Sequence, residues 1–260
     1  MAAVCKALHV GEYSSSMYLN MTGGTLQTAN ELSIGVLQHQ WGYGSGEVDL
    51  YGGTMTIGTD LNVCLNGWWG LFNMKGGTCN VAGTVYVPAG TDTLGQKAVN
   101  GELYLHGGTL TCNNFVRSTG GSSALVDIVA GQMIINGDHA TYINQGVTDG
   151  WITGYSGLTS VLCDYNISNA GKTTVRAQGS HFTNAGGNQL WSNAANWING
   201  VPTNSTFTGI VVAGTTCLVN STVTANCNKL IVGYFNTGAA TLSVTGGTLT
   251  EAVSQLSLKS

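Results

Sequence analysis

Carboxylates that could act in pairs are scarce in this sequence. Glycoside hydrolysis needs two facing carboxylates, and the nearest plausible pair is Asp127 and Asp138, with His139 beside them. A polysaccharide lyase would need a base and a cation that holds a uronate, and the arginines, Arg117 and Arg176, lie in different repeats. A stacked polar ladder is the simpler role for Asp127. We therefore expect no catalytic residue, no cofactor and no enzyme.

Threonines offer a second kind of chemistry, the recognition of an ordered lattice such as ice. Strands stacked about 4.8 Å apart would turn equivalent threonines into a flat array. Gln27 and Asn80 interrupt one of the two candidate columns, and a β-branched residue can simply restart a strand after a corner. Ice binding therefore stays an alternative. The columns are Thr25, Thr54, Thr78, Thr109 and Thr248, and Thr56, Thr111 and Thr250.

Aromatic residues on loops could stack against glycan rings. The candidates for such a surface are Trp41, Trp68, Trp69 and Tyr155, which could equally cover the edges of the core. The seven cysteines contain no CxxC pair and the five histidines are scattered, so we expect no metal site. Seven is an odd number, so at least one thiol is unpaired within the chain.

A repeat defines the elements that must position these residues. Gly-Gly-Thr occurs five times, with a degenerate copy at 130–132, and the first four copies and the degenerate one begin 29, 24, 31 and 23 residues apart. Glycines suit a tight corner because they accept a positive φ without steric cost. The corner residues are Gly23, Gly24, Thr25, Gly52, Gly53, Thr54, Gly76, Gly77, Thr78, Gly107, Gly108, Thr109, Gly246, Gly247 and Thr248.

Apolar and polar residues alternate on both sides of each corner. Val48 and Leu50 precede the second copy, and Met55 and Ile57 follow it. This period of two indicates strands with one buried face. The intervening positions before the corners are polar or variable, as at Asn20, Asp49, Asn73 and Asp127.

The repeat predicts an all-β fold, a right-handed parallel β-helix (β-solenoid) of three-strand coils of 23–31 residues. A single coil cannot bury its apolar face, whereas stacked copies can. A meander of hairpins is the alternative. Hairpins usually turn at Asn-Gly or Asp-Gly, but here the corner recurs at the same place in each unit.

The sequence also contains a second, much longer repeat in addition to the Gly-Gly-Thr repeat. Residues 5–11 (CKALHVG) resemble 227–233 (CNKLIVG), and 19–26 (LNMTGGTL) resemble 242–249 (LSVTGGTL), at offsets of 222 and 223 residues. The chain therefore ends within a module whose matching part opens it. We expect a solenoid that is the end part of one module at 1–178, a linker at 179–190, and the start of a second, homologous module at 191–260.

Three motifs in this order resemble a group of secreted proteins. They are W-S-x-A-x-N-W-x-x-G-x-P from Trp191, the GGTLxxxxLxIG coils, and DYNxxNxGKTTV from Asp164. They are similar to secreted GGTL-repeat β-helical proteins of planctomycete-like environmental bacteria and to autotransporter-passenger-like repeats. The resemblance covers most of the chain, implies an extracellular β-helix and supplies no catalytic residue. Ala170 departs from it, because proline is common at that position.

Composition excludes several classes of protein. Charged residues make up 8% of the chain, hydrophobic residues 43%, and the net charge is −4, which argues against disorder. The 39 glycines have no period of three, so the chain is not collagen. Eight Lys and Arg give no basic footprint for nucleic acid. No apolar run reaches 18 residues, so we expect no membrane span.

These patterns predict a structural protein at the cell surface or outside the cell, whose copies associate head to tail into a filament. The opening MAAVCKALHV does not have the features of a signal peptide, so we expect a part of a longer secreted protein. Neither chain end shows a capping helix, and open solenoid ends expose unpaired strand edges. A glycan-binding adhesin and a polysaccharide-degrading enzyme are further alternatives. The expected contact residues at the two ends are Leu8, Val10, Leu256 and Leu258.

Overall fold

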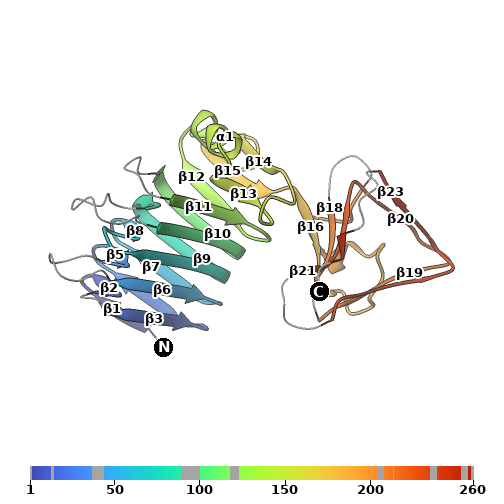
Figure 1. The fold of residues 1–260 in the computed structure, drawn as a ribbon, viewed down its shortest axis with the longest axis horizontal. Coiled ribbons are helices and arrows are strands. Elements are labelled where there is room, and N and C mark those ends of the chain that lie inside the picture. Colours follow the sequence, from blue (N-terminus) through green and yellow to red (C-terminus); the bar gives the residue numbers. More distant parts are fainter. Residues whose placement is uncertain are drawn as a thin grey trace. The chain divides into compact units, whose positions relative to one another are not determined.

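The chain folds as a β-solenoid of about nine turns, with 61% of its residues in strands and 6% in helices. The computed structural model describes residues 2–12, 15–36, 44–88, 100–117, 123–203, 208–212, 214–234, 239–252 and 257–258. Residues 1–177 form one compact unit and residues 178–260 a second. Figure 1 shows the stacked strands of each unit.

The first unit consists of three parallel ladders, one on each side of the coil. The strand before each corner belongs to the first ladder, the strand after it to the second, and a short strand to the third. Strands β9 and β10 run through all three sides. The first ladder holds β3 (Ser16–Met21), β6 (Ser45–Leu50), β9 (Trp69–Tyr86), β10 (Asn100–Val116), β11 (Ser123–Ile128) and β13 (Ile152–Gly154). The second holds β1 (Ala2–Cys5), β4 (Thr25–Thr28), β7 (Thr54–Ile57), β9, β10 and β12 (Gln132–Asn136), and the third β2 (Leu8–Val10), β5 (Leu32–Ile34), β8 (Leu61–Val63) and the last part of β9 and β10.

The core of this unit is a set of apolar columns, because each coil places the same alternating positions inside. In the first ladder, Leu50 pairs with Met74, which pairs with Leu105, and all three are fully buried. Parallel strands in register keep equivalent residues one above another. The alternation seen in the sequence therefore becomes a continuous core, as predicted.

In the first four Gly-Gly-Thr copies the second glycine has the positive φ that makes the corner possible, whereas in the fifth copy it is the first glycine, Gly246. Gly53 and Gly77 have φ values of +85° and +72°. A Cβ on Gly77 would lie 2.6 Å from the carbonyl oxygen of Gly53 in the coil below. Glycine is required at this position for two reasons: its backbone has a positive φ, and neighbouring corners stack too closely for a side chain.

A cap that the sequence analysis did not anticipate closes the far end of the first unit. Helix α1 (Ala140–Thr148) follows the last coils, and β14 (Val161–Tyr165) and β15 (Lys172–Ala177) form an antiparallel hairpin. β15 also pairs antiparallel with β12. The switch from parallel to antiparallel pairing ends the solenoid, because the hairpin cannot continue the coil.

The second unit repeats the three-sided plan. One ladder runs through β17 (Trp197–Ile198), β16 (Gly179–Phe182), β18 (Thr208–Val212), β21 (Leu230–Tyr234) and β24 (Ser257–Leu258). The others pair β19 (Thr216–Asn220) with β22 (Thr241–Thr245), and β20 (Thr224–Cys227) with β23 (Thr248–Glu251). The expected linker at 179–190 begins with β16, which pairs with β17 and β18. Its first residues therefore form a strand of the second unit.

The longer sequence period is also a structural period. Ala2 on β1 pairs with Thr25 on β4, and the residues 222 and 223 positions further on, Thr224 and Thr248, pair in the same way on β20 and β23. The strands β4 and β23 have matching bounds at an offset of 223. The opening of the first unit and the end of the second thus have the same local fold.

Candidate functional site

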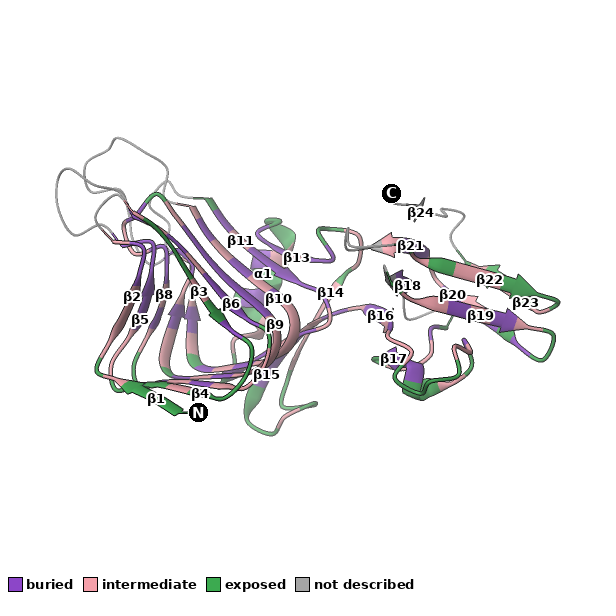
Figure 2. Ribbon diagram, turned by 90° about the horizontal axis from the view of Figure 1, so that it is seen from below, coloured by how far each residue is buried: buried purple, intermediate pink, exposed green. Residues whose placement is uncertain are grey.

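The first coil presents an open strand edge. Among the described residues, β1 pairs only with β4, β2 only with β5 and β3 only with β6. Side chains along this edge are exposed, with 73% of Val4, 54% of Met17 and 60% of Tyr18 accessible. Figure 2 shows β1 and β3 as mostly exposed strands beside the buried ones that follow. An unpaired edge with apolar side chains is a template for strand addition.

The expected contact residues at the ends have different environments. Val10 is buried, and Leu8 is half-buried in the first inward layer. Leu258 lies in β24, and Leu256 lies outside the described residues. At the open edge the large exposed apolar side chains are Val4 and Met17 instead, because Leu8 and Val10 face the core opposite Leu32 and Ile34.

A second candidate site lies on the outer face of the first ladder. Outward residues of β3, β6, β9 and β10, together with the tyrosine that directly follows β6, form one group of three tyrosines, three carboxylates, an asparagine and a lysine. We call this set the tyrosine–acid face. Its residues are Tyr18, Glu47, Asp49, Tyr51, Asn73, Lys75, Glu102 and Tyr104.

Asp49 is the centre of this face. Its side chain is fully buried, and its Oδ2 accepts hydrogen bonds from Lys75 Nζ and from the Tyr18 hydroxyl, both at 2.7 Å. Lys75 also donates to the Tyr51 hydroxyl at 2.9 Å and lies over that ring, 4.4 Å from its centroid. The Tyr18 hydroxyl lies 3.2 Å from Glu47 as well. Three neighbouring coils are therefore joined by one polar network.

The network shifts the titration of its members. Burial alone would raise the pKa of Asp49, but hydrogen bonds from Lys75 and Tyr18 outweigh it, and that pKa is lowered. Burial works against the charge of Lys75, yet its bonds to Asp49 and Tyr51 raise the pKa of Lys75. The hydrogen bond to Asp49 raises the pKa of Tyr18. Asp49 and Lys75 are thus held as an ion pair at neutral pH.

The face continues over β10. The Tyr104 hydroxyl donates to Glu102 at 2.9 Å, and the Tyr104 ring stacks on His106 with centroids 5.5 Å apart. Burial, followed by the bond to Glu102, raises the pKa of Tyr104, and burial lowers the pKa of His106. A neutral tyrosine and an imidazole of lowered basicity give this end of the face an aromatic, weakly charged surface.

Two buried acceptors on this face have no hydrogen-bond partner among the described residues. They are Oδ1 of Asp49 and Oδ1 of Asn73, on residues that pair across β6 and β9. An unmet buried acceptor is unfavourable, and each such group needs an explanation such as a water or a ligand. The face therefore has hydrogen-bonding capacity left over.

The predicted glycan-contacting aromatics are only partly brought together. Trp68 is exposed between β8 and β9. Trp69 is half-buried and shares the outer side of the first ladder with the tyrosine–acid face. Tyr155 is fully buried beside the end cap, so it cannot form a surface platform, and Trp41 lies outside the described residues. The tyrosines and Lys75 were missed, although the alternation that places Asp49 outward also places Tyr51 outward.

The weighed acid–base candidates have structural partners. Asp127 accepts hydrogen bonds from the Thr153 hydroxyl and the Ser156 amide, at 2.8 and 2.7 Å. Asp138 accepts from the amide of Ala140 at the start of α1. Asp127 thus holds the turn at Ser156, and Asp138 holds the start of α1.

Four of the five threonines predicted to share a column stack in the first unit, whereas the fifth, Thr248, pairs with Thr224 in the second unit. Thr54 pairs with Thr25 on one side and Thr78 on the other, and Thr78 pairs with Thr109. The second column is interrupted by Asn80, which accepts a hydrogen bond from Thr111 at 2.8 Å. The side chains of that column bond to one another, which leaves less of a regular array for a lattice.

Cysteine thiols belong to the core. All seven are free, and Cys64, Cys79, Cys112, Cys217 and Cys227 are buried. Burial raises the pKa of Cys64 to about 12 and of Cys112 to about 12, so these thiols are protonated and unreactive at neutral pH. The described part of the chain contains no group of three or more His, Cys, Asp and Glu side chains arranged to hold a metal ion.

Comparison with models of protein families, with curated proteins and with solved structures gives no match to this chain. Across the described ranges, no helix is long and apolar enough to cross a membrane.

Proposed function

We propose that this chain is a structural β-solenoid of the cell surface or extracellular space whose copies associate head to tail by adding strands to the open first coil. The parallel solenoid fits a structural repeat protein. The observation that carries the proposal is that β1, β2 and β3 each have an edge with no paired strand among the described residues, where Val4 and Met17 are exposed. Soluble proteins usually blunt such edges with charges, proline or a covering element.

The partner edge is the last coil of the second unit in another copy. Among the described residues β22 pairs only with β19, and β23 only with β20. These strands have the same local fold as the first coils of the chain, as the shared register shows. An edge of matched shape and direction can continue a parallel ladder, and a contact that does not close on itself gives a filament.

Electron microscopy of the purified chain and of Val4→Asp tests the association. We expect wild-type filaments and dispersed particles for Val4→Asp, because a charge on the edge opposes strand addition. Ile167→Asp is the matched control, since Ile167 is 83% exposed in the β14–β15 connection and should leave filaments intact. Dispersed wild-type particles at high concentration, or filaments in Val4→Asp, would reject this role.

The proposed location needs its own test. It rests on the resemblance of three sequence motifs to those of secreted β-helical proteins and on the low share of charged residues, 8%. Antibody labelling of intact source cells, with and without external protease, should find the protein accessible outside. If the protein resists external protease on intact cells and is degraded only after the cells are lysed, the protein lies inside the cell instead.

Glycan binding is a second candidate function, favoured by the tyrosine–acid face. Tyr18 and Tyr51 are exposed while their hydroxyls are fixed by Asp49, Glu47 and Lys75. Fixed amphipathic rings offer a stacking surface at low entropic cost. A glycan array should show binding that Tyr18→Ala with Tyr51→Ala abolishes and Tyr165→Ala, an exposed tyrosine of β14, preserves. An array without any bound glycan would reject this candidate.

A further inference from the structure

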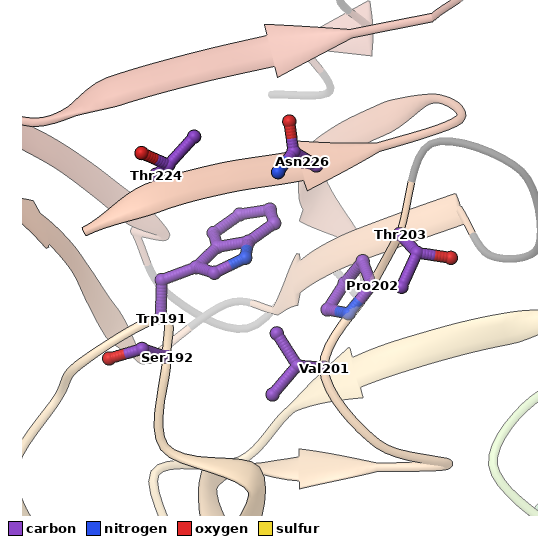
Figure 3. Close-up of a pocket in the computed structure, with 7 residues that line it drawn as sticks. All are labelled: Trp191, Ser192, Val201, Pro202, Thr203, Thr224 and Asn226. Carbon is purple, nitrogen blue, oxygen red and sulfur yellow. The ribbon is translucent and has the colours of Figure 1, made fainter.

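The second unit contains a pocket built around the tryptophan of its opening motif. It has a volume of about 580 Å³ and lies between β20 and the segments at 191–192 and 201–203. Figure 3 shows the Trp191 ring between the strand that carries Thr224 and Asn226 and the segment with Val201 and Pro202. Its lining residues are Trp191, Ser192, Val201, Pro202, Thr203, Thr224 and Asn226.

Backbone hydrogen bonds and ring contacts hold Trp191 in place. The backbone amide of Trp191 donates to the carbonyl of Leu218 at 2.9 Å, and the backbone carbonyl of Trp191 accepts from the indole nitrogen of Trp197 at 2.7 Å. The two indole rings meet edge to face with centroids 4.8 Å apart. A Cβ on Gly209 would lie 3.1 Å from the Trp191 ring, so the glycine makes room for it. The ring is thus fixed before any ligand arrives.

The indole nitrogen of Trp191 is the unexplained group. Only 1% of the Trp191 surface is accessible to solvent. Its Nε1 has no hydrogen-bond partner among the described residues. Indole N–H groups normally find a partner when buried. In Figure 3 the nitrogen lies on the ring edge nearer to Val201 and Pro202. A single donor beside an apolar wall therefore lacks its acceptor.

The lining defines the chemistry of an occupant. None of the lining side chains carries a charge, so the pocket suits a neutral molecule. Hydroxyls of Ser192 and Thr224 and the amide of Asn226 suit a ligand rich in hydrogen-bonding groups. The volume is within the usual range of small-molecule pockets, about 300–1,000 Å³. A ligand that meets the indole must offer a hydrogen-bond acceptor, and the apolar Val201 and Pro202 favour an apolar group beside that acceptor.

We propose that this pocket binds an N-acetylated sugar, with the acetamido carbonyl accepting from Trp191 Nε1 and the acetamido methyl packing on Val201 and Pro202. The sugar hydroxyls then face the polar side chains of Ser192, Thr224 and Asn226. The site is within the second unit, so it stands independently of the first-coil contact and of the tyrosine–acid face.

The indole proton itself is the readout. We expect titration with N-acetylglucosamine to move the Trp191 indole signal downfield in a proton–nitrogen spectrum, in a saturable way, while the signal of exposed Trp68 stays fixed. The Trp191 signal is assigned as the one missing in Trp191→Phe. Where that variant fails to fold, the loss of response in Asn226→Ala identifies the site, with Asn228→Ala on the same segment as a control.

Glucose, which lacks the acetamido group, is the matched probe. Losing one neutral hydrogen bond corresponds to about tenfold weaker binding, so glucose should bind at least about that much more weakly. Equal responses to the two sugars overturn the proposal. So does an unmoved Trp191 signal at saturating probe, which would assign the pocket to ordered water. Comparing the binding of free N-acetylglucosamine with that of a polysaccharide that carries this sugar only at its chain end then shows whether the pocket takes a terminal or an internal sugar unit.

Discussion

Replacing Lys75 by methionine should destabilise the first unit by leaving Asp49 buried and unpaired. Breaking a buried ion pair by removing one partner costs about 3–5 kcal/mol. The Asp49 side chain is fully buried, but that of Lys75 is 31% exposed, and Tyr18 still donates to Asp49 in the variant. Water access and this remaining bond reduce the penalty, so we expect Lys75→Met to cost about 2 kcal/mol.

Native-state hydrogen exchange is the suitable assay because it resolves the two units. Peptides that cover β6 and β9 should lose protection, and those that cover β19 to β23 in the second unit serve as an internal reference. Lys172→Met is the matched control, because Lys172 is an exposed lysine of β15. It should change protection by less than about 0.5 kcal/mol.

A second substitution separates loss of the ion pair from general damage. Asp49→Asn in the Lys75→Met background removes the stranded charge, and asparagine already occupies this outward column at positions 20 and 73. We expect it to recover most of the lost protection, to within about 1 kcal/mol of wild type. The reasoning is wrong if Lys75→Met behaves like Lys172→Met, or if the double variant is less stable than Lys75→Met alone.

The remaining predictions concern pH and the corners. The pKa of Asp49 is lowered and that of Lys75 is raised, so the pair stabilises the fold between about pH 4 and pH 10, the unfolded pKa values. Urea unfolding should show this contribution falling as the pH drops below about 4 and again as it rises above about 10. Lys75→Met should reduce the alkaline loss, and the remainder should come from Tyr18 and Tyr104, whose pKa values are also raised. Gly77→Ala should cost about 2–4 kcal/mol, because its φ is +72° and the new Cβ would lie 2.6 Å from a carbonyl. Gly23→Ala, where a Cβ would meet nothing within 4 Å, should stay within about 0.5 kcal/mol of wild type in the same urea titration.

The coil could be predicted because its signals are local and repeated. The Gly-Gly-Thr corners, the alternation around them and the polar positions at 20, 49 and 73 follow from a period of two and a constant corner. The structure places those three positions in one column by direct pairing. Where the sequence repeats, the strand positions of one coil predict those of the next. The buried face then determines the register between the strands of neighbouring coils.

The end cap and the site could not be predicted in the same way. Helix α1 has nine residues, its N-cap residue His139 makes no side-chain cap hydrogen bond, and Ile143 and Gly146 are its buried positions, so it lacks the usual signals of a helix. Tyr155 looked like a loop aromatic, but its φ of +51° turns the chain and its ring is buried. The bond from Lys75 to Asp49 joins two coils at residues 26 apart in the chain. Such contacts depend on which coils stack, and composition does not show them.

Tyr18 is where the two proposed functions of the first unit meet. It lies on the open edge strand β3, and its hydroxyl donates to Asp49 on β6. A parallel strand added beside β3 would place a further row of outward side chains in the columns that Tyr18 and Asn20 begin. Association would therefore leave the tyrosine–acid face uncovered, because strand addition uses the backbone edge and leaves the outward side chains free. A filament of these chains would display the face repeatedly, and repeated weak sites on one scaffold bind a polymeric ligand with greater avidity than any one of them.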